Sequence, residues 1–254
     1  MQIKFLTINI WFGGKVWDNL VNFIQEQKPD ILALQEVYNG QDNNLEKRFR
    51  TMDEFEELFG QFLPFNAFGA TLLDTSANVT WGNAVFSKYP ITNYQTIFFD
   101  LPFTAYNFSS DTDPRFASEG MLEAEIEVDG KKINAYSWHG VWDTHGKDTD
   151  SRFIMGDKIT ESLKDKQNII LAGDTNLDPD TKVATDIAEK LSLVSVFGNS
   201  LQSTFNVDHK ENSGNYANSA VDMVFASHGF KVLSKEMPQV DISDHFPLLV
   251  EFEI

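Results

Sequence analysis

Apolar positions near the start of the chain follow first a period of two and then a helical spacing. Residues 2–10 alternate and end on polar Asn9, which predicts a strand. Apolar side chains then recur at helical spacing over residues 16–24, and Pro29 stops that helix because proline cannot continue it. The apolar run in Asp30–Val37 predicts a second strand. The chain therefore opens with a strand–helix–strand unit.

A second amphipathic helix is predicted over residues 45–59, and the chain then changes to shorter segments with strand-like alternation. Turn signals such as Asp129-Gly130 separate these segments and predict hairpins. The predicted strands are Phe65–Leu73, Gly82–Phe86, Ile91–Phe99, Met121–Val128 and Lys132–Trp138. The segment Pro102–Ser118 mixes aromatic and polar residues without a period, so we expect a long surface loop there.

The last third of the chain contains two predicted helices, a buried strand between them and three closing strands. One helix covers Asp150–Leu163, and the apolar run Ile169–Ala172 predicts the buried strand. The other helix starts at Asp178-Pro179, with Asp178 as the N-cap and proline as the first helical residue. The closing strands are Val221–Ser227, Phe230–Lys235 and Pro247–Glu253. Because no repeat or linker interrupts these patterns, we expect residues 1–254 to form a single domain.

The composition allows one large hydrophobic core and excludes several kinds of site. The 254 residues are 42% hydrophobic and include 22 Phe and 5 Trp, enough to fill the interior of one domain. The absence of cysteine excludes disulfides, thiolate metal sites and CxxC redox chemistry. No apolar run is long enough to predict a transmembrane segment. The N-terminus runs into a predicted strand without a signal-peptide pattern, so we expect a cytoplasmic protein; a secreted mature form or a trimmed chain would begin in the same way.

The charge of the chain argues against a long polyanionic partner. Its 38 acidic and 20 basic residues give a formal net charge of −18. A charge of this sign repels nucleic-acid phosphates. Bound divalent cations would cancel part of that field locally, so a nucleic-acid partner is disfavoured rather than ruled out.

Polar side chains end five of the predicted strands, where a hydrophobic core would otherwise continue. Each has an ordinary structural explanation, such as a capping Asn, a solvated Glu, a core His or an Asx turn. Their coincidence favours a shared site formed by Asn9, Glu36, His139, Asp174 with Asn176, and Asp244-His245. A period of two places Asp174 and Asn176 on the same side, so that a charged acceptor and an amide would face one spot.

Six short segments stand in order along nearly the whole chain. They are Thr7-Ile8-Asn9-Ile10-Trp11, Leu34-Gln35-Glu36-Val37, Gly82-Asn83-Ala84-Val85-Phe86-Ser87-Lys88-Tyr89-Pro90-Ile91, Gly173-Asp174-Thr175-Asn176, Val221-Asp222-Met223-Val224-Phe225 and Ser243-Asp244-His245-Phe246-Pro247. In these segments the chain resembles the endonuclease/exonuclease/phosphatase superfamily, the deoxyribonuclease-like group of Mg²⁺-dependent phosphoesterases. The resemblance implies an α/β (α+β) fold: a four-layer sandwich of two mainly antiparallel β-sheets flanked by α-helices, with the site at one end.

The resemblance also implies a metal site and a residue that orients or deprotonates the attacking water. Glu36 resembles the metal ligand of the family, and Asn9 and Asp244 would assist it. Oxygen ligands of this kind suit Mg²⁺, with Mn²⁺ as a substitute. Asp174 matches the position that orients or deprotonates the attacking water, and Asn176 would donate to the phosphate.

Two histidines complete the predicted site. His245 resembles the histidine that contacts the phosphate, as base or as electrostatic stabiliser, and Asp222 resembles the carboxylate that fixes its tautomer. His139 resembles a histidine near the leaving oxygen, acting as general acid or phosphate binder. The residues next to it differ from the threonine-histidine motif that is usual in the family.

The remaining histidine and arginine positions offer a possible zinc pair and a possible phosphate contact. A zinc pair of His139 with His145 lacks the further His or Cys ligands that zinc needs. Many family members have an arginine for the phosphate near Gly120, where this chain has Glu119. Arg115 and Arg152 are the remaining candidates for that contact.

We therefore expect a Mg²⁺-dependent hydrolase of phosphodiesters or phosphomonoesters that uses metal-assisted attack of water. The acidic balance, Glu119 and the aromatic loop favour a small or lipid-like substrate. A DNA or RNA endonuclease or exonuclease is the alternative, because aromatic side chains would stack unpaired bases; the candidates are Trp138, Trp142, Tyr106 and Phe108. A noncatalytic phosphate-binding module is the third possibility, and the competent residues at every principal position argue against it.

Overall fold

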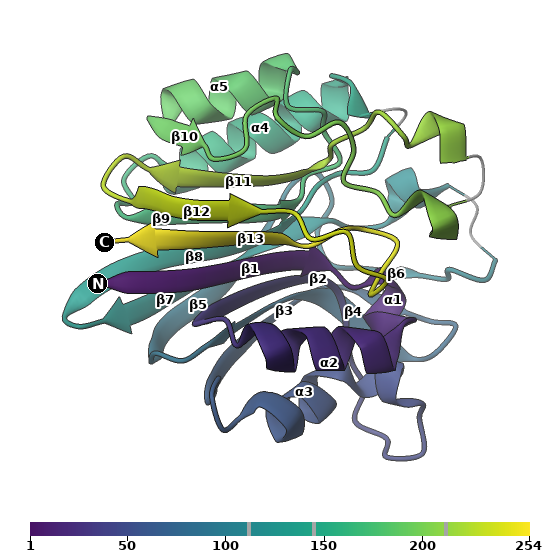
Figure 1. The fold of residues 1–254 in the computed structure, drawn as a ribbon. Helices are drawn as coiled ribbons and strands as arrows, with labels where there is room; N and C mark the ends of the chain where they lie inside the picture. Colours follow the sequence, from purple (N-terminus) through teal and green to yellow (C-terminus); the bar gives the residue numbers. More distant parts are fainter. Residues whose placement is uncertain (111–112, 144–145, 211–212) are drawn as a thin grey trace.

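The computed structural model describes residues 1–110, 113–143, 146–210 and 213–254 and places the strands in two β-sheets (Figure 1). The strands of the first sheet are β1 Gln2–Asn9, β2 Ile31–Asn39, β3 Phe65–Asp74, β4 Val79–Ser87, β6 Thr104–Tyr106, β12 Lys231–Glu236 and β13 Leu248–Glu253. Their order is β12-β13-β1-β2-β4-β3-β6. Two of the pairs, β1–β2 and β3–β6, are parallel, and the others are antiparallel.

The second sheet is built from strands that lie between Ile91 and Ser227. Its strands are β5 Ile91–Phe98, β7 Gly120–Val128, β8 Lys131–His139, β9 Ile169–Asp174, β10 Leu193–Ser195 and β11 Asp222–Ser227. They run in the order β10-β11-β9-β8-β7-β5, and only the β8–β9 pair is parallel. The expected sandwich of mainly antiparallel sheets is confirmed.

Helices cover the outer face of each sheet. Helices α2 Trp17–Gln27 and α3 Thr51–Phe59 pack on the first sheet, and α4 Asp150–Leu163 and α5 Lys182–Lys190 pack on the second (Figure 1). The layers therefore run helix, sheet, sheet, helix, as the resemblance implied. Short turns complete the chain: α1 Trp11–Gly14, η1 Lys47–Arg50, η2 Pro114–Phe116, η4 Val207–His209 and η5 Ser213–Asn215.

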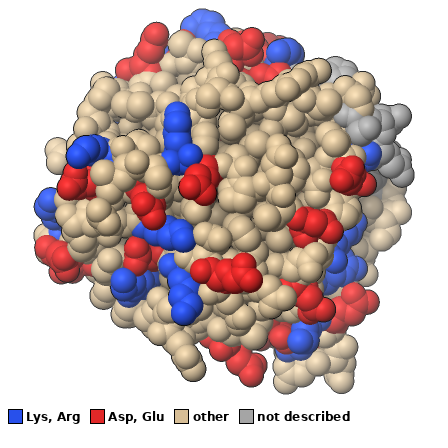
Figure 2. All heavy atoms as spheres, in the orientation of Figure 1, with Lys and Arg blue, Asp and Glu red and all other residues tan. Residues whose placement is uncertain are grey.

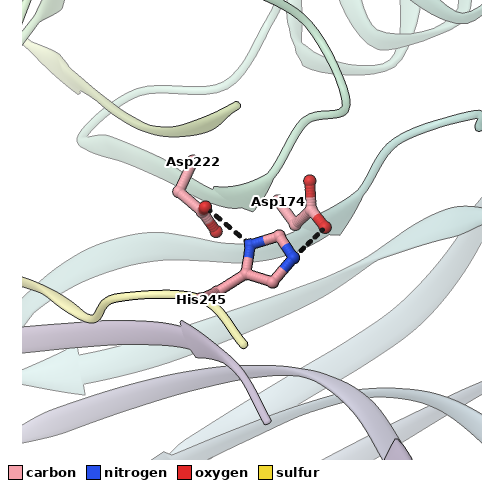
Figure 3. A group of neighbouring side chains, drawn as sticks. All are labelled: Asp174, Asp222 and His245. Carbon is pink, nitrogen blue, oxygen red and sulfur yellow. Dashed lines mark hydrogen bonds and ion pairs between the residues drawn. The ribbon is translucent and has the colours of Figure 1, made fainter. Parts of the chain in front are cut away.

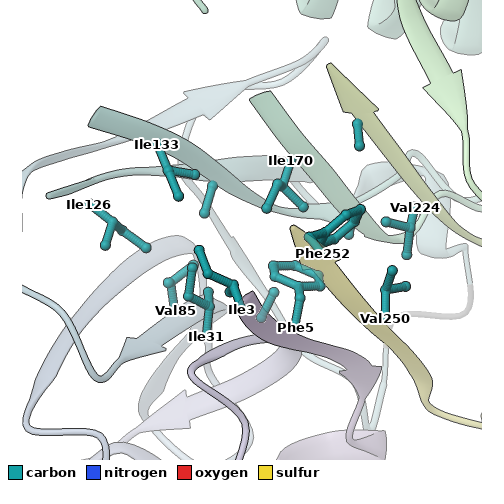
Figure 4. Close-up of a cluster of buried hydrophobic side chains, with 14 of the residues drawn as sticks. Ile3, Phe5, Ile31, Val85, Ile126, Ile133, Ile170, Val224, Val250 and Phe252 are labelled. Carbon is teal, nitrogen blue, oxygen red and sulfur yellow. The ribbon is translucent and has the colours of Figure 1, made fainter. Parts of the chain in front are cut away.

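The faces of the two sheets that meet inside the sandwich are apolar along most of their length. Ile3 and Phe5 of β1 point into this layer, where they meet Ile133, Ile170 and other buried side chains of the second sheet (Figure 4). Fully burying one such side chain contributes about 1.5–3 kcal/mol, so this layer is a main source of stability. Because side chains alternate along a strand, the residues that continue the same face can be read directly from the sequence.

At one end of the sandwich the same inner faces become polar. In β1 the series that begins with Ile3 and Phe5 continues with Thr7 and Asn9, and both of these are buried. In β9 the corresponding series ends at Asp174. A buried polar group without a partner costs about 1–3 kcal/mol, so this end of the interior must be held by hydrogen bonds.

Gln35 supplies some of these hydrogen bonds beneath the polar end. Its amide nitrogen donates to Ser137 Oγ at 2.8 Å and to Thr7 Oγ1 at 3.3 Å, which links β2 with β8 and β1. Ser137 Oγ in turn donates to the carbonyl of Leu34 at 2.7 Å. The polar layer thus connects the two sheets where the apolar layer stops.

Several predicted boundaries are corrected by the structure. The predicted helix over residues 45–59 divides into η1 and α3, the loop after residue 102 contains β6 and η2, and β10 was not predicted. Helix α5 begins at Lys182, because Thr181 is the N-cap and its hydroxyl accepts from Ala184 N. Asp178 instead uses its carbonyl to accept from Thr181 N at 3.1 Å, in a turn before the helix.

None of the helices among the described residues combines the length and the apolar character needed to cross a membrane.

Candidate active site

Three predicted residues lie in one row across neighbouring strands of the second sheet. Asp222 of β11 and His139 of β8 are both register partners of Asp174 in β9. Residues in register on adjacent strands point to the same face, and here that is the inner face of the sandwich. The polar strand ends that the sequence identified are therefore brought together.

Asp174 is the centre of this row. Its Oδ1 accepts from the backbone N–H of Asn176 at 3.0 Å, and its Oδ2 accepts from Asn9 Nδ2 at 3.0 Å. The same Oδ2 lies 3.6 Å from Nε2 of His245 and 3.7 Å from Nε2 of His139. Burial would raise the pKa of Asp174, but the two imidazoles and the Asn9 amide outweigh it and hold the pKa below its usual value. Asp174 is therefore ionised, and its oxygens can accept hydrogen bonds.

Each of the two imidazoles is backed by a second carboxylate. His245 Nδ1 lies 2.8 Å from Asp222 Oδ2, on the side opposite Asp174 (Figure 3). His139 Nδ1 lies 3.0 Å from Glu119 Oε2 in the same way. Both histidines are nearly inaccessible to solvent. The site therefore contains two imidazole–carboxylate pairs that face one shared Asp174.

These carboxylates change the protonation of the histidines. Burial alone would lower the pKa of His139, but Glu119 and Asp174 outweigh it and raise the pKa to about 10. Burial would likewise lower the pKa of His245, and Asp222 and Asp174 raise it to about 9. Both imidazoles are therefore cations at neutral pH, able to donate from Nε2.

Glu36 reaches the site through an irregularity in its strand. The pairing of β2 with β4 shifts register between Leu34 and Val37, and Glu36 has a left-handed φ of 61°. A bulge of this kind re-aims a side chain, and a left-handed non-glycine residue costs about 1–3 kcal/mol. Glu36 Oε2 accepts from the backbone N–H of Phe12 at 2.6 Å, and Oε1 accepts from Asn9 Nδ2 at 2.9 Å.

Asn9 acts as a bridge between two carboxylates. Its amide nitrogen donates to both Glu36 and Asp174, while its Oδ1 accepts from the backbone N–H of Trp11 at 3.0 Å. In this arrangement Asn9 positions the acids and presents a donor to them. Its predicted contact with a metal would require its oxygen to turn towards the cavity.

Asp244 lies on the segment that leads into β13 and carries an unexpected partner. Its Oδ1 accepts from Ser243 Oγ at 3.2 Å, and its Oδ2 forms an ion pair with the ammonium of Lys210. Lys210 belongs to a polar stretch that carried no strand or helix signal, so the sequence did not identify it. Burial would lower the pKa of Lys210, but Asp244 outweighs it and raises the pKa.

Asn176 closes the opposite wall of the site. Its backbone is left-handed, with φ of 53°, and its Nδ2 donates to the carbonyl of Gly140 at 2.9 Å. One of the two hydrogens of the amide group remains for another acceptor. The prediction that Asn176 donates to a phosphate stays a prediction that this geometry permits.

Two adjoining cavities open onto these residues. The main cavity has a volume of about 290 Å³ and is lined by the acids and both histidines, with Trp81, Phe108 and other aromatic side chains at its wall. The second cavity, of about 180 Å³, contains Asp143, Arg152 and Ser219. The residues that line both cavities are Trp142, Asn176, Phe205 and Tyr216.

The structure corrects the prediction that Trp138 contacts the substrate. Trp138 was a candidate for stacking on the substrate, but its side chain is fully buried beneath the helices of the second sheet, 6.5 Å from the ring of Phe225. The alternation of β8 explains this, because His139 points into the sandwich and the preceding residue must point outward. Of the other aromatic candidates, Trp142 and Phe108 line the main cavity, and Tyr106 is buried in a separate aromatic cluster.

The predicted arginines do not join the row of acids. Arg115 is exposed and forms an ion pair with Asp113 at 2.7 Å. Arg152 is fully buried, and its guanidinium donates to the carbonyls of Val141, Asp143 and Lys147. Arg152 therefore anchors the segment after β8 and reaches the second cavity rather than the main one. His145 lies outside the described residues.

The carboxylates that line the main cavity include Glu36 and Asp244. Oxygen ligands of this kind suit Mg²⁺ in a site that keeps several waters. Asp174, Asp222 and His245 also form a compact group whose ligand atoms lie within 4.8 Å of one another. In that group the hydrogen bond between His245 and Asp222 occupies one ligand atom of each, as Lys210 occupies Oδ2 of Asp244.

A family model described as Endonuclease/Exonuclease/phosphatase family matches residues 6–245. Solved structures with a similar fold include an endonuclease/exonuclease/phosphatase from Beutenbergia cavernae DSM 12333, with a TM-score of 0.77 and 17% identity over 100% of this chain and 72% of that chain. The human Nocturnin catalytic domain with bound sulfate has a TM-score of 0.71 and 18% identity over 99% and 94%. Sphingomyelinase C from Streptomyces griseocarneus has a TM-score of 0.66 and 15% identity over 99% and 99%. No curated protein matches the sequence.

Proposed function

Because the chain belongs to the endonuclease/exonuclease/phosphatase family of metal-dependent hydrolases, we propose that it hydrolyses a small or lipid-like phosphoester by direct attack of water. The observation that carries this proposal is the position of Asp174. One buried carboxylate lies between two imidazolium groups, each of which is held by a further acid. This arrangement offers a proton acceptor and two proton donors around one point, as the hydrolysis of a phosphoester requires.

Asp174 would orient the attacking water and take its proton as the bond to phosphorus forms. His245, as a cation, would donate from Nε2 to a nonbridging phosphate oxygen and stabilise the charge that develops there. His139 would give the proton on its Nε2 to the leaving oxygen as the ester bond breaks. Asp222 and Glu119 hold these rings through Nδ1, so each Nε2 faces Asp174, beside which the phosphate would bind.

We propose Mg²⁺ as the cofactor, held by Glu36 and Asp244 with assistance from Asn9. A cation at this place would neutralise a nonbridging oxygen and ease departure of the leaving group. Asn9 contributes by keeping Glu36 and Asp174 at a fixed separation through its two hydrogen bonds.

The small size of the two cavities supports a compact substrate. The shared wall at Trp142, Asn176, Phe205 and Tyr216 would let the phosphate occupy the main cavity while an attached group enters the second. On the face in Figure 2 the described Lys and Arg side chains lie among Asp and Glu and do not form a basic band. With a net charge of −18, this disfavours a duplex. The similarity in fold to a sphingomyelinase C is consistent with a lipid phosphodiester.

A single-stranded nucleic acid is the second candidate substrate. The observation in its favour is Trp142, whose side chain lies at the junction of the two cavities and is 43% exposed. An exposed indole at this place would stack an unpaired base.

The proposal is tested by turnover of an aryl phosphodiester with Mg²⁺, with EDTA, and with Glu36→Ala in Mg²⁺. We expect turnover in the first case and a loss of at least about 10²-fold in the other two, since the cation would lose its principal ligand. Glu189→Ala, at an exposed position of α5, is the matched control and should retain activity. Equal turnover in all cases would refute the metal mechanism, and no turnover of any phosphoester would favour a noncatalytic phosphate-binding module.

A panel of substrates then separates the two candidates. Sphingomyelin, a phosphoinositide, nucleotide monoesters, RNA and single-stranded DNA differ in the group attached to the phosphate. We expect the highest kcat/KM with a small or lipid phosphoester. Preferential cleavage of the single strands, reduced by Trp142→Ala through KM, would replace this proposal with a nuclease.

A further inference from the structure

Lys210 is the one lysine or arginine among the described residues that lines the main cavity. Its ammonium forms an ion pair with Asp244 Oδ2, and its side chain is 20% exposed. The ammonium also lies 4.8 Å from the ring centroid of Phe205 and 5.5 Å from that of Tyr216. These contacts place a fixed positive charge inside a cavity whose acids are expected to bind a cation.

The carboxylate of Asp244 is held so that Lys210 contacts one particular oxygen. Oδ1 accepts from Ser243 Oγ, and the Asp244 carbonyl accepts from Asn206 N at 2.8 Å. The single hydroxyl hydrogen of Ser243 is shared between Asp244 Oδ1 and the carbonyl of Asn9, which lies 2.7 Å from Oγ and ties this segment to the end of β1. Oδ2 is therefore the oxygen presented to a cation, and the ammonium already occupies it.

We infer that Lys210 is an internal competitor that lowers the affinity of the site for its divalent cation by occupying Asp244 Oδ2. This inference rests on the proposed function, because it takes Asp244 to be a metal ligand. A divalent cation that binds Asp244 has to displace the ammonium from Oδ2. The measured association constant is then the intrinsic constant divided by the factor by which the ion pair is favoured over its broken form.

The side chain of Lys210 is suited to such displacement. Lysine is a point charge on a flexible four-carbon stem, so the ammonium can leave Asp244 without movement of the backbone. The ammonium already lies over the rings of Phe205 and Tyr216, so it can keep cation–π contacts when it leaves Oδ2. An exposed ion pair would be too weak to compete, but this pair is largely withdrawn from water.

Any loss of positive charge near the cavity would also attract a divalent cation, and this general effect needs its own control. Lys15 provides it, because its ammonium lies 4.4 Å from the ring centroid of Trp11, a residue that also lines the main cavity. Lys15 is exposed, and no ion pair is found for it within the described part of the chain. Lys15→Met therefore removes the same charge near the same cavity without freeing Asp244.

The experiment measures Mn²⁺ binding by calorimetry to the metal-free protein, to Lys210→Met and to Lys15→Met, at 0.05 and 0.5 M salt. We expect Lys210→Met to lower the Kd for Mn²⁺ about tenfold at both salt concentrations, because direct competition is screened little. Lys15→Met should change the Kd less than about threefold, and less again at high salt. An unchanged or weaker affinity of Lys210→Met, or no binding by either protein, would overturn the inference.

A double-mutant cycle with Asp244→Asn tests whether the competition is for Asp244 itself. In the Asp244→Asn background, Lys210→Met should change the Kd no more than Lys15→Met does. A gain that persists at tenfold would show a general charge effect and refute the inference. Thermal unfolding of each variant checks that the proteins are folded.

Turnover of the aryl phosphodiester is recorded separately, so the two proposals fail in different ways. Tighter Mn²⁺ binding by Lys210→Met without any turnover by the native chain would support the inference and refute the proposed hydrolysis. Normal turnover by the native chain with an unchanged Mn²⁺ affinity of Lys210→Met would refute the inference and support the proposed hydrolysis.

Discussion

Both imidazole–carboxylate pairs face Asp174 through the Nε2 atom of their histidine. They differ in which parts of the fold supply the two partners. His139 and Glu119 come from neighbouring strands of one sheet: His139 ends β8, and Glu119 directly precedes β7, where Gly120 is the register partner of His139. His245 and Asp222 come from different sheets, since Asp222 begins β11 and His245 lies on the segment leading into β13. One pair is fixed by a strand ladder, and the other depends on how the two sheets pack.

The segment that carries His245 is tied down by several local hydrogen bonds. Phe246 N donates to the carbonyl of Thr204 at 2.7 Å, and His245 N donates to Ser243 Oγ at 3.3 Å. The ring of His245 also lies 4.6 Å from that of Phe205, which lines both cavities. His139 instead lies near Trp81, at 5.8 Å between ring centroids. The two pairs therefore contact different walls of the site, which suggests different partners on the substrate.

Removing the group that both pairs share should have the largest effect. We expect Asp174→Asn to lower kcat by about 10⁴-fold, because the proposed acceptor for the proton of water is lost. It should also lower the pKa of both His139 and His245, since each loses a facing carboxylate. Steady-state kinetics and NMR titration of the metal-free protein measure the two effects. Asp157→Asn, at an exposed position of α4, is the control, and a decrease in only one of the two histidine pKa values would show that Asp174 is not shared.

Replacing each histidine by glutamine should separate their roles through the leaving group. For His139→Gln we expect kcat to fall about 10³-fold with an alkyl leaving group and less than about tenfold with a nitrophenolate, which departs without a proton. For His245→Gln we expect a loss of about 10²–10³-fold with both, because the phosphate contact does not depend on the leaving group. A parallel loss for both variants across leaving groups would give the two pairs the same role.

Much of this site could be predicted because it lies at the ends of regular strands. The alternation that places Ile170 and Ala172 in the core also places Asp174 on the inner face. The same rule would have excluded Trp138, since it is adjacent to His139 on one strand and must point the other way. Aromatic character alone does not tell whether a side chain faces the site; its place in the alternation of the strand does.

Other features depend on contacts that no local pattern contains. Glu36 points into the site because of a bulge, which alternation does not predict. Glu119 stands out in the sequence only as the residue in place of an arginine, and its partner His139 is 20 positions further along the chain. Lys210 lies in a polar stretch, and its partner Asp244 is distant in sequence. Residues of this kind become visible only when the tertiary structure brings the partners together.

The carboxylates behind the histidines should have a smaller effect than the histidines themselves. We expect Glu119→Gln to lower kcat for an alkyl phosphoester about 10–10²-fold, because His139 keeps its place but loses a charge that holds its proton. Since Glu119 raises the pKa of His139, the loss of activity at high pH should begin at lower pH in the variant. The pH profile of kcat measures this shift. Asp222→Asn is the comparison. It should not change the pH at which deprotonation of His139 lowers kcat.

The last expected effect concerns stability and not turnover. It distinguishes the two histidines by the pH range in which each loses its contribution to the free energy of unfolding. The pKa of each histidine is raised in the folded protein, to about 10 for His139 and about 9 for His245, against about 6.5 in an unfolded chain. Protonation of each histidine therefore contributes stability that is fully present below about pH 6.5 and is lost as pH rises through the folded pKa. These shifts correspond to at most about 5 kcal/mol for His139 and about 3 kcal/mol for His245.

Urea unfolding of the metal-free protein from pH 6.5 to 10 measures this loss, with His139→Gln and His245→Gln as variants and exposed His228→Gln as the control. The free energy of unfolding should fall less steeply with pH in both variants than in the native chain. In His245→Gln the remaining fall should continue to higher pH than in His139→Gln, because His139 has the higher folded pKa. If the native chain and both variants instead showed the same pH dependence, neither imidazole would be a buried cation. The two pairs would then act as neutral hydrogen-bonded units, and proton donation to the leaving oxygen would have to come from elsewhere.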